Sequence, residues 1–319
     1  MNRNLVRNLL AATTVIACGA AQAGEVVFVD SYHEGYPWSD GITSGIQSTL
    51  EGAGHNLTIV RMDTKRNKGD DFKTEAAQKA LDVIKEKNAD VVIACDDNAA
   101  KYLIVPHLKD TDTQVVFCGL NWDATAYGFP APNVTGMVEV ASADELVGML
   151  LPSAAGDRVG FIGSDTASEH KNLENIVAKF GDSINMTEDR FAKNFDEFKA
   201  KYTEIQEKVD IVIFSNSAGI EGWDDTAAEE FILANTKLPT GSMQPFMQNF
   251  VTLVFGKVSE EQGAWSANAA MEIMGGKAAG DIPIVHNKEG VIIVNGKISV
   301  ASGVEIPAEL IEVANAVIE

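Results

Sequence analysis

Aromatic and polar side chains of the kind that hold small solutes follow the first apolar run of this chain. The run Val26–Val29 is followed at once by a short turn that carries Tyr32, Tyr36 and Trp38. Aromatic rings can stack on a planar group or face a cation, and a few polar groups beside them fix a ligand's orientation. The pattern predicts a binding site for a small molecule.

Candidate contacts on the loops after predicted strands fall into three chemical groups. The aromatic side chains are Tyr32, Tyr36, Trp38 and Trp122. The carboxylates, which can pair with a ligand ammonium group, are Asp96, Asp97, Asp123 and Glu139. The neutral groups, which suit a ligand carboxylate, are Ser31, Asn98, Asn121, Ser164, Asn216 and Ser217.

Each group also has an ordinary structural interpretation, which stays open at the level of sequence. Trp38 could begin the apolar stripe of its helix, Asp97 could cap a helix start, and the neutral residues could cap or turn the chain. We favour a site role for Trp122, because it directly follows a strand end in a polar setting. Of the two neighbouring acids, Asp96 is the stronger candidate for a ligand contact.

Alternating strand and helix patterns must position these side chains. The predicted strands are Val26–Val29, Leu57–Arg61, Val91–Ala94, Gln114–Phe117, Val134–Val138, Arg158–Ile162, Ile184–Thr187 and Ile211–Phe214. The helices predicted between them favour parallel sheets with helices on both faces, in which ligands bind at the carboxyl ends of the strands. We therefore predict an α/β fold with two Rossmann-like lobes, divided near residues 139–144.

The tail of the chain mixes both kinds of element. A hairpin strand is predicted at Val291–Val294, with Asn295-Gly296 at its turn, and a closing helix at Ala308–Ile318. In the first predicted helix, Gly41 and Gly45 lie beside an apolar stripe and would allow another segment to approach closely.

The amino terminus has the three parts of a secretory signal in residues 1–23, which predicts a periplasmic protein. A competing interpretation is a lipoprotein, attached through Cys18. The formal net charge of −21 argues against nucleic acid as a partner. Cys95 and Cys118 are interpreted first as two small buried residues, with a disulfide as the alternative.

Motifs for catalysis and cofactors are missing from the sequence. It has no HExxH, no Walker loop, no GxSxG and no metal-binding cysteine spacing. We expect no enzyme, no metal and no cofactor. An exported enzyme with Cys95 as nucleophile beside Asp96 is the weakest alternative.

Several blocks, in order along the chain, resemble the periplasmic substrate-binding proteins of ABC transporters, in the branch with tryptophan- and other amino-acid-binding members. The blocks are Ser31–Trp38, Phe117–Trp122, Asn133–Met137, Gly276–Pro283 and Val304–Pro307. The segment Cys95–Asn98 is more acidic than the small, hydroxyl-rich loop usual in that branch, which leaves the ligand class open.

The resemblance implies a type I periplasmic-binding fold whose two lobes close on a ligand by a hinge motion. The first lobe would span 24–140 and roughly 250–278, and the second 141–249 and roughly 279–319. The implied protein is a monomer that binds a small polar solute, amino-acid-like or an aromatic heterocycle, and delivers it to an ABC permease. A sensory protein that presents its ligand to a membrane receptor is the alternative.

Overall fold

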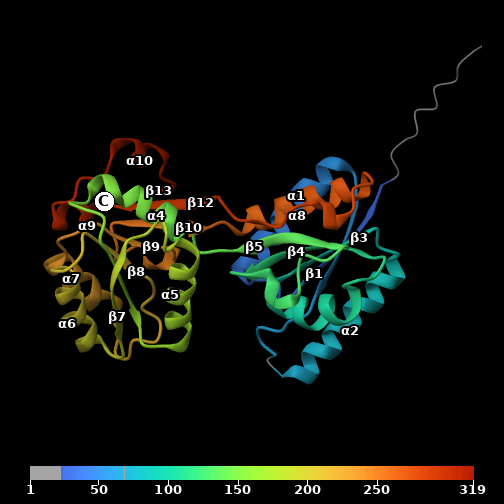
Figure 1. The fold of residues 1–319 in the computed structure, drawn as a ribbon, viewed down its shortest axis with the longest axis horizontal. Helices are drawn as coiled ribbons and strands as arrows, with labels where there is room; N and C mark the ends of the chain where they lie inside the picture. The colour runs from blue at the N-terminus through green and yellow to red at the C-terminus, as the bar shows by residue number, and fades with distance from the viewer. Residues whose placement is uncertain (1–22, 68) are drawn as a thin grey trace, which may run out of the picture.

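The computed structural model describes residues 23–67 and 69–319, which form two α/β lobes side by side (Figure 1). Apart from Ala23, the predicted export signal, and with it Cys18, lies outside the described residues. Each lobe has a mostly parallel sheet with helices on both faces, as the alternation of patterns predicts. The two-lobe prediction is confirmed.

The first lobe is built on a six-stranded, all-parallel sheet in the order β11-β5-β4-β3-β1-β2. Its strands are β1 (Glu25–Asp30), β2 (Asn56–Arg61), β3 (Val91–Cys95), β4 (Gln114–Asn121), β5 (Val134–Glu139) and β11 (Val285–His286). Its helical segments are α1 (Pro37–Ala53), α2 (Asp70–Lys87), α3 (Asp96–Ala99), η1 (Ala100–Leu108), η2 (Ala124–Tyr127), α8 (Ser259–Met274) and η5 (Ala279–Asp281).

The second lobe is built on a seven-stranded sheet in the order β13-β12-β10-β9-β8-β6-β7. Its strands are β6 (Val159–Ser164), β7 (Met186–Ala192), β8 (Ile211–Phe214), β9 (Thr240–Ser242), β10 (Leu253–Lys257), β12 (Gly290–Asn295) and β13 (Ala316–Ile318). Its helical segments are α4 (Ala143–Leu150), η3 (Leu151–Ser153), α5 (Ala167–Phe180), α6 (Phe195–Ile205), α7 (Asp225–Asn235), η4 (Pro245–Met247), α9 (Gly296–Ser302) and α10 (Ala308–Val313).

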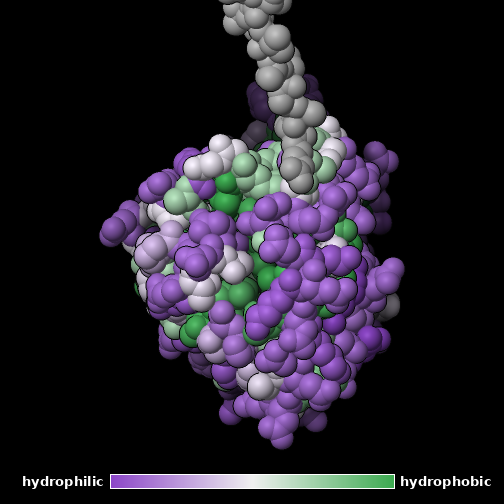
Figure 2. Space-filling model, turned by 90° about the vertical axis from the view of Figure 1, so that its right-hand side faces the viewer, coloured by the Kyte–Doolittle hydropathy of each residue, from purple (hydrophilic) through white to green (hydrophobic). Residues whose placement is uncertain are grey.

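Strand periodicity explains how the first sheet is covered on both faces. Val26 and Phe28 pack toward α1 and α8, whereas Val27 and Val29 pack toward α2 and η1. Successive side chains of a strand point to opposite faces, so a wholly apolar strand serves two helix layers at once. The end of the molecule formed by this lobe carries mainly hydrophilic residues on its surface (Figure 2).

Helices α1 and α8 lie against each other although they are far apart in sequence (Figure 1). A Cβ atom on Gly45 would overlap the carbonyl of Glu260, and one on Gly263 would overlap that of Ile42. The close approach expected at Gly45 is therefore confirmed, and its partner is the returning helix α8. Ile42 and Ile46 form the buried stripe beneath it.

The chain passes between the lobes three times, after β5, between β10 and α8, and between β11 and β12. The sheets therefore divide the chain differently from the ranges expected from sequence: residues 253–257 pair in the second sheet and 285–286 in the first. The cause is the position of the crossings. Strand β10 precedes the second crossing and pairs in the second sheet, whereas β11 precedes the third crossing and pairs in the first sheet.

Two predictions for the tail are wrong. Asn295-Gly296 is no hairpin turn, because the Asn295 side chain accepts a hydrogen bond from the backbone N–H of Ile298 and caps α9. The closing helix ends at Val313, and the last residues form β13, parallel to β12. No helix among residues 23–67 and 69–319 is long and apolar enough to cross a membrane.

Candidate binding site

A cavity of about 490 Å³ opens between the lobes, at the carboxyl ends of the first-lobe strands. First-lobe residues supply most of its lining, the second lobe supplies three residues from the end of β9 to the start of η4, and the second crossing supplies Lys257 and Ser259. The lining residues are Tyr32, Tyr36, Pro37, Trp38, Lys65, Asp96, Asn121, Glu139, Met243, Gln244, Pro245, Lys257 and Ser259. Its position and size suit a small solute.

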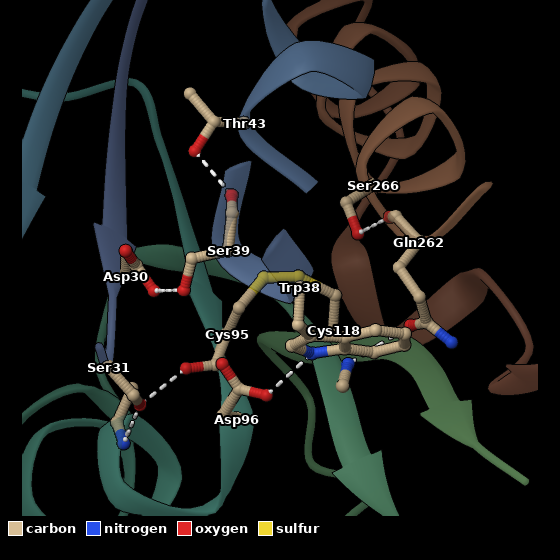
Figure 3. Close-up of a disulfide and its surroundings, with 12 residues drawn as sticks. Asp30, Ser31, Trp38, Ser39, Thr43, Cys95, Asp96, Cys118, Gln262 and Ser266 are labelled. Atoms are coloured by element: carbon tan, nitrogen blue, oxygen red, sulfur yellow. Dashed lines mark hydrogen bonds between the residues drawn. A yellow bond between two sulfur atoms is a disulfide. The ribbon is translucent and has the colours of Figure 1, made fainter. Parts of the chain in front are cut away.

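Asp96 is the buried acid of this cavity. It directly follows β3, is 2 % exposed, and has a φ of +71°, a left-handed conformation that few non-glycine residues adopt. Its Oδ1 accepts a hydrogen bond of 3.1 Å from the indole Nε1 of Trp38 (Figure 3), while its Oδ2 is buried without a hydrogen-bond partner. Backbone strain of this kind concentrates at ligand sites.

Several features of the strand ends hold Asp96 in place. Cys95 and Cys118 form a disulfide between neighbouring strands β3 and β4, with their Cα atoms 4.5 Å apart (Figure 3). Gly119, next in β4, has no Cβ, and one would lie 2.7 Å from Asp96 Oδ1. The Ser31 hydroxyl donates to the carbonyl of Cys95 and accepts from the N–H of Ala99.

The disulfide settles the alternative left open by the sequence. Cys95 and Cys118 are both buried and bonded to each other, so the preferred interpretation as two separate small residues is wrong. It also removes the free thiol on which the exported-enzyme alternative depended.

Burial raises the pKa of Asp96 well above its usual range, and the nearby carboxylates of Glu139, Asp30 and Asp97 raise it further. The hydrogen bond from Trp38 acts in the opposite direction, because it stabilises the ionised form. Burial followed by the Asp96 charge likewise raises the pKa of Tyr32. The surroundings of Asp96 therefore disfavour its ionised form while one of its oxygens has no hydrogen-bond partner.

Two lysines lie on the aromatic surfaces of the cavity. The Nζ of Lys65 is 4.7 Å from the ring centroids of both Tyr32 and Tyr36, which meet edge to face at 5.4 Å. The Nζ of Lys257 is 5.6 Å from the ring of Trp38 and forms an ion pair with Glu139. These distances are within the range of a cation–π interaction.

The ion pair also joins two crossings, because Glu139 ends β5 and Lys257 ends β10. A second link joins the first crossing to the third: the Asn287 side chain accepts a 2.7 Å hydrogen bond from the N–H of Val140 and donates one of 3.1 Å to its carbonyl. The cavity thus lies directly beside the crossings between the lobes.

Six of the predicted contact residues line the cavity, namely Tyr32, Tyr36, Trp38, Asp96, Asn121 and Glu139. Trp38 fulfils both of its interpretations, because its ring also packs against the core beneath α1.

The other first-lobe candidates have structural contacts instead. Asp97 accepts hydrogen bonds from Asn121 and Tyr127, Asn98 donates to Thr64, and Ser31 holds the start of α3. Asp123 caps η2 through the N–H of Thr125. Trp122 is outside the lining and packs against the main core. Its neighbour Asn121, not Trp122, reaches the cavity.

The second-lobe candidates also lie outside this cavity. Ser164 ends β6, where its hydroxyl is 3.3 Å from that of Thr166, and Asn216 accepts from the N–H of Ala218 in the loop after β8. Ser217 lies in the same loop. These loops are at the carboxyl ends of second-sheet strands, as expected, but none of the three residues is in the lining of the cavity.

Lys65, Lys257 and Ser259 line the cavity and were not among the predicted contacts. Lys65 follows β2 by four residues, so the strand-end rule that located Tyr32 could have found it. Lys257 and Ser259 lie at the second crossing, whose position depends on sheet topology. Among the described residues, no group of three or more His, Cys, Asp and Glu side chains could hold a metal ion.

Comparisons with known proteins agree with this architecture. The family model described as ABC transporter substrate binding protein matches residues 33–318. No curated protein matches the chain in sequence.

Solved structures share the fold at low identity. A substrate-binding protein with adhesive properties from Clostridium difficile, in a ligand-free, open structure, has 16 % identity and a TM-score of 0.69, with 93 % of this chain and 99 % of that chain covered. An ABC domain from Streptococcus pneumoniae in complex with L-Trp has 16 % identity and a TM-score of 0.56, covering 93 % and 100 %. An ABC transporter solute-binding protein from Bradyrhizobium sp. BTAi1 with bound bis-tris has 14 % identity and a TM-score of 0.58, with 90 % of this chain and 88 % of that chain covered.

Proposed function

Because the chain belongs to the family of ABC transporter substrate-binding proteins, we propose that it binds a small polar solute between its lobes and delivers it to an ABC permease. The observation that carries the proposal is the cavity at the strand ends, in which a buried acid and three aromatic rings surround space of solute size. The fold and the family support a binding role rather than catalysis.

Closure of the lobes supplies the second half of the site in this proposal. The polar loops after β6 and β8 contribute Ser164, Asn216 and Ser217, which lie outside the present cavity. A hinge rotation about the three crossings would bring such loops toward the solute, and the closed form would then contact the permease. The solute's contacts with both lobes would stabilise the closed form.

The proposed solute is amino-acid-like or an aromatic heterocycle. Tyr32, Tyr36 and Trp38 offer stacking surfaces, and the carboxyl of Asp96 offers a polar contact. A structural neighbour in complex with L-Trp is compatible with this class. We further propose that the predicted signal exports the chain to the periplasm, where such a receptor would meet its solute before import.

Thermal unfolding of the mature protein against amino acids, amines, nucleobases, vitamins and sugars tests the proposal. A solute at 100 times its dissociation constant adds about 2.7 kcal/mol to the unfolding free energy, which raises the Tm by a few degrees at most in a chain of this length. We expect one chemical class to raise the Tm. Small molecules released by denaturing the purified protein control for a solute retained during purification. If no solute raised the Tm and denaturation released no small molecule, the result would contradict the proposal.

A further inference from the structure

Of the two acids and two lysines that line the cavity, only Glu139 and Lys257 form an ion pair with each other. Glu139 is paired with Lys257, and Lys65 faces two tyrosine rings. Asp96 has no Lys, Arg or His ion-pair partner within the described part of the chain, and its Oδ2 accepts no hydrogen bond. A buried ionised carboxylate without a partner is strongly unfavourable.

The other acids around Asp96 have their own partners. Asp30 is ion-paired with Arg61 at 2.5 Å and accepts from Ser39, and Asp97 accepts from Asn121 and Tyr127. Among these neighbouring acids, the buried acceptor without a partner therefore belongs to Asp96.

From this arrangement we propose that the solute carries a cationic nitrogen, which binds Oδ2 of Asp96 among the rings of Tyr32, Tyr36 and Trp38. The inference rests on the proposed solute-binding function and narrows it to amines, amino acids with a free ammonium group, and related protonated nitrogen compounds. It assigns Asp96 as the residue that selects them over neutral and anionic solutes.

Two independent observations favour a cationic nitrogen over a neutral solute group that would accept a hydrogen bond from the protonated carboxyl of Asp96. The protein's own ammonium groups already lie on the rings that line the cavity, Lys65 on both tyrosines and Lys257 on Trp38. The electron-rich faces of these rings attract cations. In addition, the indole N–H of Trp38 donates to Oδ1 of Asp96 and stabilises its ionised form, which leaves the buried Oδ2 as the acceptor without a donor.

Binding of such a solute is linked to proton release. Without solute, burial and the charges of Glu139, Asp30 and Asp97 raise the pKa of Asp96, so its neutral form persists to higher pH than usual. Lys257 is held by Glu139, Lys65 lies over the rings of Tyr32 and Tyr36, and Tyr32 carries no charge near neutral pH, so none of them is an ion-pair partner of Asp96. A cation binds the ionised form, so affinity should rise about tenfold per pH unit below that pKa.

Isothermal titration with paired probes tests the inference. The probes are tryptamine, phenethylamine, L-tryptophan and L-tyrosine, each beside its N-acetyl derivative, which lacks the charge, together with any solute found by thermal unfolding. We expect the charged member of a pair to bind and its N-acetyl derivative to bind at least about 100-fold more weakly, as for removal of one member of a buried ion pair.

The variant Asp96→Asn keeps the shape of the side chain and removes its charge. It should weaken binding of the charged probe by about 100-fold and abolish the rise of affinity with pH. Asp97→Asn is the matched control, because it makes the same charge change one residue away, outside the cavity lining. Circular dichroism checks that both variants fold, and the pH profile of the unmodified protein tests the linkage without any variant.

The outcomes separate the two levels of the proposal. Tight binding of a solute without a cationic nitrogen, unaffected by Asp96→Asn, would overturn the inference and leave the solute-binding function in place. Equal weakening by Asp97→Asn would also overturn it, because the effect would then be a general one of charge. Failure of every solute to bind the unmodified protein would reject the proposed function itself.

Discussion

In each lobe, a buried carboxyl group at the carboxyl edge of the sheet has an oxygen without a hydrogen-bond partner, and the two groups have different surroundings. Asp96 in the first lobe and Glu169 in the second are 2 % and 5 % exposed, and each has one oxygen without a hydrogen-bond partner. Burial is the largest cause that raises the pKa of either group. Only Asp96 lines the cavity.

The difference lies in what the neighbouring elements supply. Asp96 lies among aromatic rings, beside a disulfide and a glycine that admits its carboxyl group. Glu169 lies in the first turn of α5, near the side chains of Ser215 and Asn216, which counter part of its pKa shift by hydrogen bonding. A buried acid therefore indicates a ligand contact only where a cavity of suitable chemistry adjoins it.

The largest effect is expected from removing the disulfide, which is confined to the first lobe. The double substitution Cys95→Ser and Cys118→Ser opens a covalent loop across 23 residues of sequence separation. For a loop of this length the unfolding free energy should fall by about 3 kcal/mol, as measured by denaturant unfolding. Solute affinity should fall too, because Asp96 directly follows Cys95.

The control is the reductant. Denaturant unfolding of the unmodified protein should shift to lower midpoint when a reductant is present, whereas the double variant should not respond. Limited proteolysis should open the variant at first-lobe sites before second-lobe sites. Cleavage of both lobes at equal rates would show that loss of the disulfide does not destabilise the first lobe more than the second.

The next effect concerns two tryptophans of the first lobe. Trp38→Phe keeps an aromatic ring but removes the N–H that donates to Asp96. A hydrogen bond to a charged group contributes about 1.5 kcal/mol or more, so we expect roughly tenfold weaker binding in isothermal titration. Trp122→Phe is the matched control, because Trp122 packs on the core outside the cavity lining.

We expect the affinity of Trp122→Phe to stay within about threefold of the unmodified protein, because Trp122 does not line the cavity and changes away from such contacts alter free energies by about 0.5 kcal/mol. A greater loss with Trp122→Phe than with Trp38→Phe would restore the role that its place after β4 predicted. It would also show that the first-lobe wall extends farther along the strand end than the present cavity does.

Local patterns predicted most of the fold. The strands of the first lobe and the stripe of Ile42, Ile46 and Leu50 follow from period and burial alone. The prediction for Asn295-Gly296 is wrong because the Asn295 side chain caps α9 through Ile298, and the prediction for the last residues is wrong because they pair with β12. A turn dipeptide and a short apolar run look alike in both contexts.

The part of the site that lies at the carboxyl ends of the first-lobe strands could be predicted from the sequence. The strand-end rule found Tyr32, Trp38, Asp96 and Asn121, because parallel strands bring their carboxyl ends to one edge. It did not separate Asn121 from Trp122, since one residue of register decides which side chain faces the cavity. Lys257 enters through a crossing that only the topology of two sheets defines.

The smallest effect on binding is expected from the second lobe's buried acid. Glu169→Gln should leave solute affinity within about threefold in isothermal titration, because Glu169 lies outside the cavity lining. Its effect should instead appear in stability as a function of pH. The raised pKa of Glu169 means that the folded state holds its proton to higher pH than the unfolded state does.

The unmodified protein should therefore lose stability relative to Glu169→Gln as pH rises from the usual range of a glutamate through the raised pKa. Above it, the variant should be more stable by about 1 kcal/mol, because it buries no charge with an unpartnered oxygen. Denaturant unfolding at pH 4 and pH 8 measures the difference. If Glu169→Gln instead weakened solute binding as strongly as Asp96→Asn, the lobes would each contribute one acid to the closed site, and a solute with two cationic groups would fit it.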